Sequence, residues 1–193
     1  IAVIGSAASA VQFVPEIRKT AGQVHLFQRT PNWILPKEDT PYTEAELEAF
    51  RKDPTPLLEM RSDIEGRMNR GMTFALKDLL ELSEKYGLAA LSVVNDPEVR
   101  AKLTPDHPFG CKRPLLSNDY FKAFNERNLE LVTEPIARIT NNAVVTDDGV
   151  EREVDLIVMA TGFAATKFAA TVDITGRDGV SIVDAWSEGA QAY

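Results

Sequence analysis

The sequence is poor in the side chains that form disulfides and metal sites. It has one cysteine, Cys111, and two histidines among 193 residues. A single thiol cannot form an internal disulfide, and it is typical of a reducing, cytoplasmic location, which we expect here. So few thiol and imidazole groups also disfavour a tetrahedral zinc site, so we expect no metal.

Long apolar runs and an excess of positive charge are absent as well. No run approaches the roughly 20 apolar residues that a membrane helix needs, and no signal peptide is visible. Lys and Arg number 21 against 29 Asp and Glu, which gives a formal net charge of −8. This balance argues against nucleic acid or an anionic membrane as a partner. Any anion site must therefore be built locally, from a few cations and backbone amides.

The first 28 residues predict a strand, a helix and a second strand. Residues 1–4 form a short apolar run that suits a buried parallel strand, and residues 24–27 form another. Between them, residues 9 to about 20 have the spacing of an amphipathic helix, although Pro15 opposes it. Because an apolar strand starts at Ile1 and nothing after Asp184 predicts a closing element, we expect a fragment of a longer polypeptide.

The stretch from about residue 31 to 108 is rich in charges and helix formers. Thr43 and Glu46 form a capping box that opens a helix through about Lys52, and Asp96 followed by Pro97 predicts the start of another. We interpret residues 40–105, approximately, as a helical insertion. Apolar side chains recur there at helical spacing, and we expect them to be core, namely Leu57, Met60, Ile64, Met68, Leu76, Leu79 and Leu80.

Strand signals return after residue 128. Short β-like runs cover residues 129–132, 136–139 and 143–146, a turn at 147–149 leads into 150–154, and an apolar strand covers 156–159. Together these patterns predict an α/β fold, with a Rossmann-like parallel sheet, a helical insertion and a small antiparallel β-meander.

The loop after the first strand partly matches the dinucleotide fingerprint G-x-G-x-x-G. Alanines replace the second and third glycines, and the added methyl groups weaken the match. An ordinary strand-to-helix turn explains such a loop equally well. In the nucleotide hypothesis, the pyrophosphate binds at the helix N-terminus. The contacting residues are then Gly5, Ser6, Ala7, Ala8, Ser9 and Ala10.

Two groups of cations complete the candidate site. Arg29 follows the second strand, where NAD-preferring folds place an acid, and its guanidinium suits the 2′-phosphate of NADPH. Lys112 and Arg113 lie in a loop marked by Gly110 and Pro114. The alternative for each is an ordinary exposed cation. A cysteine nucleophile at Cys111 is disfavoured because no base is placed beside it by spacing alone.

Four segments then resemble the NADPH-binding domain of Baeyer–Villiger and related flavin-containing monooxygenases. They occur in the family's order and span nearly the whole chain: VIGSAASAVQ at 3–12, FQRTPNW at 27–33, FGCKRP at 109–114 and ATGF at 160–163. The resemblance implies that residues 1–163 form the NADP-binding domain. It also implies that residues 164–193 lead back toward an FAD-binding domain of the same polypeptide.

The resemblance assigns roles to matching residues. It implies that Arg29, Thr30 and Lys112 hold the 2′-phosphate, and that the catalytic Arg113 stabilises negative charge on the oxygen-bearing flavin. Gln12 matches a cofactor contact, and Thr161 and Gly162 lie at a crossing point near NADP or FAD. The two alanines of the loop, Ala7 and Ala10, depart from the family pattern and bear on how tightly the pyrophosphate binds.

The implied activity belongs to a longer enzyme that uses NADPH and FAD to insert oxygen into a ketone. We expect the isolated domain to be inactive, because the flavin carries the chemistry. Its substrate is then a small ketone or sulfide. Two alternatives stay open: another N- or S-oxygenating monooxygenase or reductase with both cofactors, and a nucleotide-sensing module without catalysis. A disulfide reductase is disfavoured because the chain has no C-x-x-C.

Overall fold

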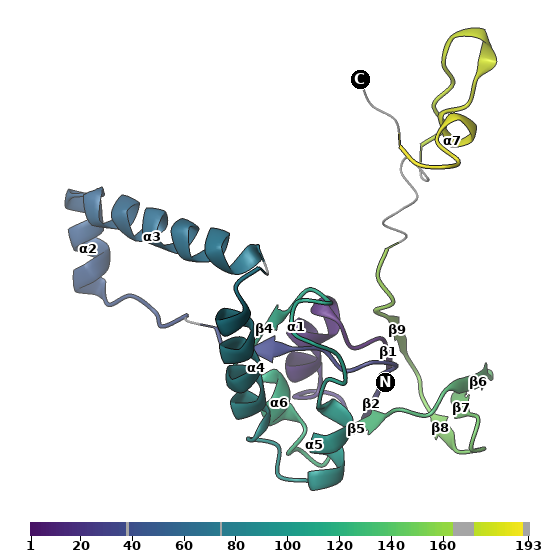
Figure 1. Ribbon diagram of the computed structural model, residues 1–193. Helices are drawn as coiled ribbons and strands as arrows, with labels where there is room; N and C mark the ends of the chain where they lie inside the picture. The colour runs from purple at the N-terminus through teal and green to yellow at the C-terminus, as the bar shows by residue number, and fades with distance from the viewer. Residues whose placement is uncertain (38, 74, 164–171, 191–193) are drawn as a thin grey trace. The chain divides into compact units, whose positions relative to one another are not determined.

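A computed structural model describes residues 1–37, 39–73, 75–163 and 172–190 (Figure 1). The chain divides into two compact units, Ile1–Ala160 and Thr161–Tyr193. Part of the predicted C-terminal segment, residues 164–171 and 191–193, lies outside the described residues. Among the helices that are described, none combines the length and the apolar character needed to cross a membrane.

A four-stranded parallel sheet forms the centre of the first unit. Its strands lie in the order β5 (Leu129–Val132), β2 (Val24–Phe27), β1 (Ala2–Ile4) and β9 (Ile157–Met159). All three neighbouring pairs are parallel. The Rossmann-like parallel sheet predicted from the sequence is confirmed, with β2 and β5 at the expected positions and β1 and β9 each starting one residue later.

Apolar side chains cover both faces of this sheet, as its short apolar strands require. On one face, Val3 and Leu26 pack with residues of helix α1 (Ala8–Ile17) and helix α6 (Tyr120–Ala123). On the other face, Ala2 and Phe27 pack with Val144 of the meander. Neighbouring strand residues thus enter different clusters, because side chains alternate between the faces of a strand.

Helix α1 is shorter than the predicted helix over residues 9–20. It begins at Ala8 and ends at Ile17, and Pro15 lies inside it and is buried. After Ile17 the backbone tightens, because Lys19 and Thr20 donate to carbonyls three residues earlier. Pro15 therefore does not break this helix, although the sequence analysis counted it against a helix here.

The helical insertion consists of α2 (Glu44–Lys52), α3 (Thr55–Met72), α4 (Lys77–Leu91) and α5 (Pro97–Leu103). Both predicted N-caps are confirmed. Thr43 and Glu46 form the reciprocal capping box, and the Asp96 side chain accepts from the amides of Glu98 and Val99.

The expectation that the apolar residues of α3 are core is wrong for the described chain. Leu57, Met60, Ile64 and Met68 are between 37% and 54% exposed. Helical spacing gathers such residues on one face, but it does not state what covers that face. Figure 1 draws α2 beside α3, and the Tyr42 hydroxyl donates to the Met60 sulfur at 3.1 Å. In α4, Leu79 and Leu80 are half-buried, while Leu76, just before it, is exposed.

The predicted antiparallel meander is confirmed as β6 (Ile136–Ile139), β7 (Ala143–Thr146) and β8 (Glu151–Glu153). Gly149 turns between β7 and β8 with φ +82°, where glycine is favoured. Sequence patterns missed the parallel pair β3 (Ile34–Leu35) and β4 (Leu115–Leu116). Two residues are too few to show an alternating pattern.

The second unit contains more regular structure than the sequence indicated. A short 3₁₀ turn covers Arg177–Gly179, and helix α7 covers Ile182–Ala185. The Ser181 side chain caps α7 by accepting from the amide of Val183. The expectation of no helix from Asp184 onward is therefore wrong, because this serine cap begins the helix just upstream of Asp184.

An ion cluster joins the parallel sheet to the meander. Glu130 of β5 accepts from Arg152 of β8 at 2.7 Å, and its other oxygen lies 2.6 Å from His25 Nδ1. His25 is thus a packed strand residue that pairs with Glu130. The Arg152 guanidinium, followed by the His25 hydrogen bond, holds the pKa of the Glu130 carboxyl below its usual value.

This cluster gives a pH-dependent prediction for Glu130→Gln. A lowered folded-state pKa stabilises the fold above the ordinary value of 4.5, and the contribution is lost as pH falls through the folded pKa. The variant should therefore melt at a lower temperature than the parent at neutral pH, with the difference shrinking in acid. Thermal melts measured from neutral pH down to below the ordinary pKa of 4.5 test this prediction. Glu65→Gln, an exposed change of equal charge on α3, is the control. A constant difference at every pH would contradict the prediction.

Candidate functional site

The loop between β1 and α1 makes a tight turn at the carboxyl end of β1. Gly5 has φ +107°, which side chains rarely adopt, and its amide donates to the Phe27 carbonyl at 3.0 Å. The next residues fit alanine. Ala7 has φ −90° and is exposed, whereas Ala10 is fully buried in the core. Neither methyl group therefore obstructs the turn itself.

The N-terminus of α1 is open to an anion. No side chain among the described residues caps it, and no acidic residue lies in its first turn. Ala8 and Ser9 are exposed, and exposed Gln12 donates to the Ala8 carbonyl at 2.9 Å. The first amides of a helix lack partners within the helix and lie at its positive end, so they bind anions well.

The segment after β2 carries one cation and several inward contacts. Arg29 is exposed and Thr30 is half-buried. Gln28 is buried and donates to the Lys102 carbonyl at 2.9 Å. Asn32 donates to the Ser6 carbonyl at 3.1 Å, which ties this segment directly to the loop after β1.

The parallel pair β3–β4 places the two cationic segments before neighbouring strands. The Leu115 amide donates to the Trp33 carbonyl at 2.8 Å, and the Ser117 amide donates to the Leu35 carbonyl at 3.0 Å. Because paired parallel strands run in one direction, the residues that precede each strand lie at the same end. Arg29 precedes β3, and Lys112 and Arg113 precede β4.

These three cations are free to meet a ligand. Arg29, Lys112 and Arg113 are all exposed. Within residues 1–37, 39–73, 75–163 and 172–190, none of them forms a salt bridge. In a chain of net charge −8, these three cations before two adjacent strands, without a salt bridge to the described residues, form a candidate anion site.

The structure also describes Thr161 and Gly162, and the side chains of Cys111 and His107 in the loop before Lys112. Thr161 and Gly162 belong to the second compact unit, where both are exposed and Gly162 has φ +83°. The Cys111 thiol is exposed. His107 Nδ1 lies 3.4 Å from Asp106, and its Nε2 has no hydrogen-bond partner among the described residues.

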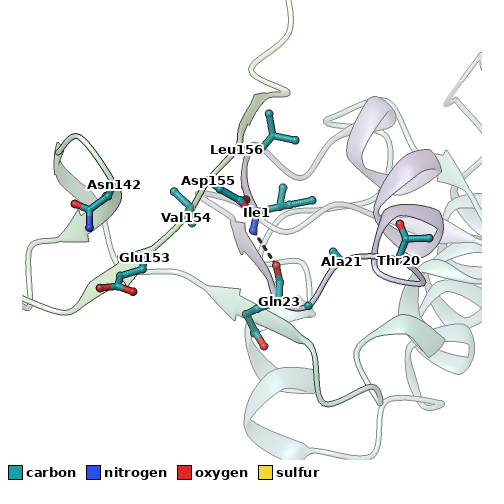
Figure 2. A pocket seen from close by; sticks show the side chains of 10 residues that line it. Ile1, Thr20, Ala21, Gln23, Asn142, Glu153, Val154, Asp155 and Leu156 are labelled. Atoms are coloured by element: carbon teal, nitrogen blue, oxygen red, sulfur yellow. Dashed lines mark hydrogen bonds between the residues drawn. The ribbon is translucent and has the colours of Figure 1, made fainter.

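A hollow of about 840 Å³ lies at the other end of the strands, where β1, β2 and β9 begin (Figure 2). Ile1, Gln23 and Leu156 line it just before or at the start of β1, β2 and β9, and the Ile1 ammonium donates to the Gln23 carbonyl at 2.8 Å. Nucleotides bind open α/β sheets at the carboxyl ends of strands. The loop after β1, rather than this hollow, is therefore the candidate site.

Sequence reasoning missed the residues that hold the cationic loop. Glu84 of α4 accepts from the Phe109 amide at 2.9 Å, and the Trp33 indole donates to the His107 carbonyl at 2.8 Å. Trp33 and Asn32 stand within the FQRTPNW segment but had no assigned role. Glu84 gave no signal, because a single acid on a charged helix is ordinary.

Comparison with known proteins identifies relatives along the whole chain, although no family profile matches it. The chain is 42% identical to a Baeyer–Villiger monooxygenase of Pseudomonas aeruginosa, matching all of this chain and 37% of that protein. It is 32% identical to another from Streptomyces coelicolor, covering 38% of it. The chain thus spans somewhat over a third of the length of these curated relatives.

Solved structures give the same result. The structure of OTEMO in complex with FAD and NADP matches with a TM-score of 0.80 and 29% identity, over all of this chain and 44% of OTEMO. An open structure of cyclohexanone monooxygenase matches with a TM-score of 0.78 and 26% identity, over 45% of that protein.

The turn after β1 predicts different outcomes for two small substitutions. Gly5→Ala places a side chain at φ +107° and should lower the free energy of unfolding by about 1–3 kcal/mol. Ala7→Gly, at φ −90° and with an exposed methyl, should change it by less than about 0.5 kcal/mol. Urea denaturation measures both. Equal effects would show that the turn does not depend on glycine at position 5.

Proposed function

The chain belongs to the Baeyer–Villiger monooxygenase family, and from this we propose that it is the NADPH-binding region of an FAD-dependent monooxygenase. The proposal places the NADP-binding domain at residues 1–163, with the helical insertion at about 40–105. Residues 164–193 would lead toward an FAD-binding domain. Cyclohexanone monooxygenase is among the neighbours, and we infer that the whole enzyme here oxygenates a ketone.

The β3–β4 pair is the observation that carries this proposal. It puts the segment with Arg29 and Thr30 and the segment with Lys112 and Arg113 before adjacent parallel strands. NADPH differs from NADH by a phosphate on the adenosine ribose, so a group of cations beyond strand β2 favours NADPH. A guanidinium offers this phosphate a planar fork of donors, and an ammonium adds a second charge.

The remainder of the nucleotide fits the loop after β1. We assign the pyrophosphate to the open N-terminus of α1, where backbone amides and the helix dipole favour negative charge. Its contacts would come from half-buried Gly5 and the exposed Ala7, Ala8 and Ser9, with exposed Gln12 one turn further. Ser6 and Ala10, both predicted as contacts, are buried and would support the loop from beneath. The buried methyl of Ala10 already packs within the core, so it leaves the outer side of the loop clear. Contacts of Thr161 and Gly162 with either cofactor rest on the family resemblance.

FAD, when bound, supplies the oxygen chemistry, with NADPH as its reductant. We assign Arg113 to stabilising negative charge at the flavin and Lys112 to the phosphate. Pro114 disfavours a helical backbone at Arg113, which follows a bend at Lys112 and precedes β4. The separate roles of these two adjacent cations rest on the family resemblance.

Removing the Arg29 guanidinium tests nucleotide preference. In the whole protein, Arg29→Ala should weaken NADPH binding about 10- to 100-fold, because hydrogen bonds to charged groups contribute roughly 1.5–3 kcal/mol. NADH binding should stay unchanged, since it has no 2′-phosphate. Titration calorimetry gives both dissociation constants. Arg138→Ala, which removes an exposed cation from β6, is the control. Equal affinity of the parent for both nucleotides would refute NADPH preference.

Separate roles for Lys112 and Arg113 give a second test in the whole enzyme. Arg113→Ala should reduce ketone oxygenation by about 100- to 1,000-fold while NADPH binds nearly as before, because one charge-stabilising donor contributes that much to rate. Lys112→Ala should mainly weaken NADPH binding. Product analysis and equilibrium binding separate the two effects. Loss of nucleotide affinity in Arg113→Ala would instead assign that residue to binding.

A further inference from the structure

We propose that Trp33 and Glu84 are positioning residues that fix the Lys112–Arg113 loop beside Arg29, and so set the preference for NADPH over NADH. The inference rests on the proposed function, since it concerns how that site is held together. Neither residue has to touch the nucleotide. Each acts through the backbone of residues 107–109, just before the cationic pair.

Trp33 joins the two cationic segments with one buried side chain. It is 6% exposed and follows Arg29 by four residues. Its indole N–H donates to the His107 carbonyl at 2.8 Å, and its ring lies 5.9 Å from the ring of Phe109 at a tilt of 59°. A polar bond and an aromatic contact therefore connect the same two segments.

Helix α4 supports this tryptophan from the other side. A Cβ on Gly87 would meet Trp33 Cε3 at 2.8 Å, closer than real Cβ contacts allow. The glycine thus lets the indole lie against the helix backbone. The position of Trp33 therefore depends on the lack of a side chain at Gly87.

Glu84 lies three residues before Gly87, so both are on one face of α4. One of its carboxylate oxygens accepts from the Phe109 amide at 2.9 Å. The loop is consequently attached at two adjacent points, through the His107 carbonyl to Trp33 and through the Phe109 amide to α4. Arg29, at the end of β2, and the Lys112–Arg113 pair then have a common support.

Loosening this support should affect the two nucleotides differently. The pyrophosphate site is built on α1 and the loop after β1, which neither Trp33 nor Glu84 contacts through a recorded hydrogen bond. Only the 2′-phosphate requires both cationic segments in one place. A displaced loop therefore costs NADPH affinity and spares NADH, because geometry within fractions of an ångström governs charge-assisted bonds.

The experiment measures dissociation constants of NADPH and NADH for the whole protein by calorimetry, together with thermal melting. Trp33→Phe removes the N–H donor, and Glu84→Ala removes the acceptor. Each should lower the NADPH:NADH preference about 3- to 10-fold, the equivalent of one hydrogen bond, with NADH affinity unchanged. Glu84→Gln keeps an oxygen acceptor and should retain the parental preference. This rescue would not follow from a charge effect.

Ile34→Val is the matched control, because it removes a methylene from buried strand β3 next to Trp33 but leaves both hydrogen bonds. It should lower the melting temperature without changing the preference. The inference is overturned if Trp33→Phe and Glu84→Ala keep the parental ratio, or if Glu84→Gln behaves like Glu84→Ala. A parent with no preference would overturn the proposed function instead, whereas loss of preference in Arg29→Ala alone would leave that function standing and reject the positioning role.

Discussion

Two backbone hydrogen bonds between β3 and β4 are the constraint on which the candidate site depends. They join Trp33 to Leu115 and Leu35 to Ser117, segments about 80 positions apart in the chain. Without this pairing, the cations before each strand would be separate surface charges of little consequence. Because the pair is parallel, the loops that precede the two strands share one end, and this arrangement makes the exposed charges a candidate site.

The helical insertion does more than connect β3 to β4 in the chain. Its last long helix, α4, packs on β3 and supplies Gly87 and Glu84 to the junction around Trp33. The loop that carries Lys112 and Arg113 is therefore bonded to a helix that a minimal dinucleotide fold lacks. By contrast, the apolar face of α3 is uncovered in the described chain, so the insertion is not uniformly part of one core.

The partial match to the dinucleotide fingerprint shows why the residue type and the backbone conformation at each position have to be considered together. Glycine at position 5 is required by a positive φ, whereas Ala7 has an ordinary negative φ and Ala10 packs in the core. The three glycine positions of the motif thus have different physical requirements. Only the first of them depends on backbone freedom in this chain.

The sequence alone determined the parallel sheet, the capped helices, the meander and the family, because apolar periodicity, N-caps and turn residues act locally. It also identified the cations that we assign to the nucleotide. Tertiary structure decided that those cations precede two paired strands, that Trp33 and Glu84 bond to the backbone of residues 107–109, and that the apolar side chains of α3 are partly exposed. Such facts depend on contacts between distant segments, and a pattern of neighbouring residues does not encode which surface another segment will cover.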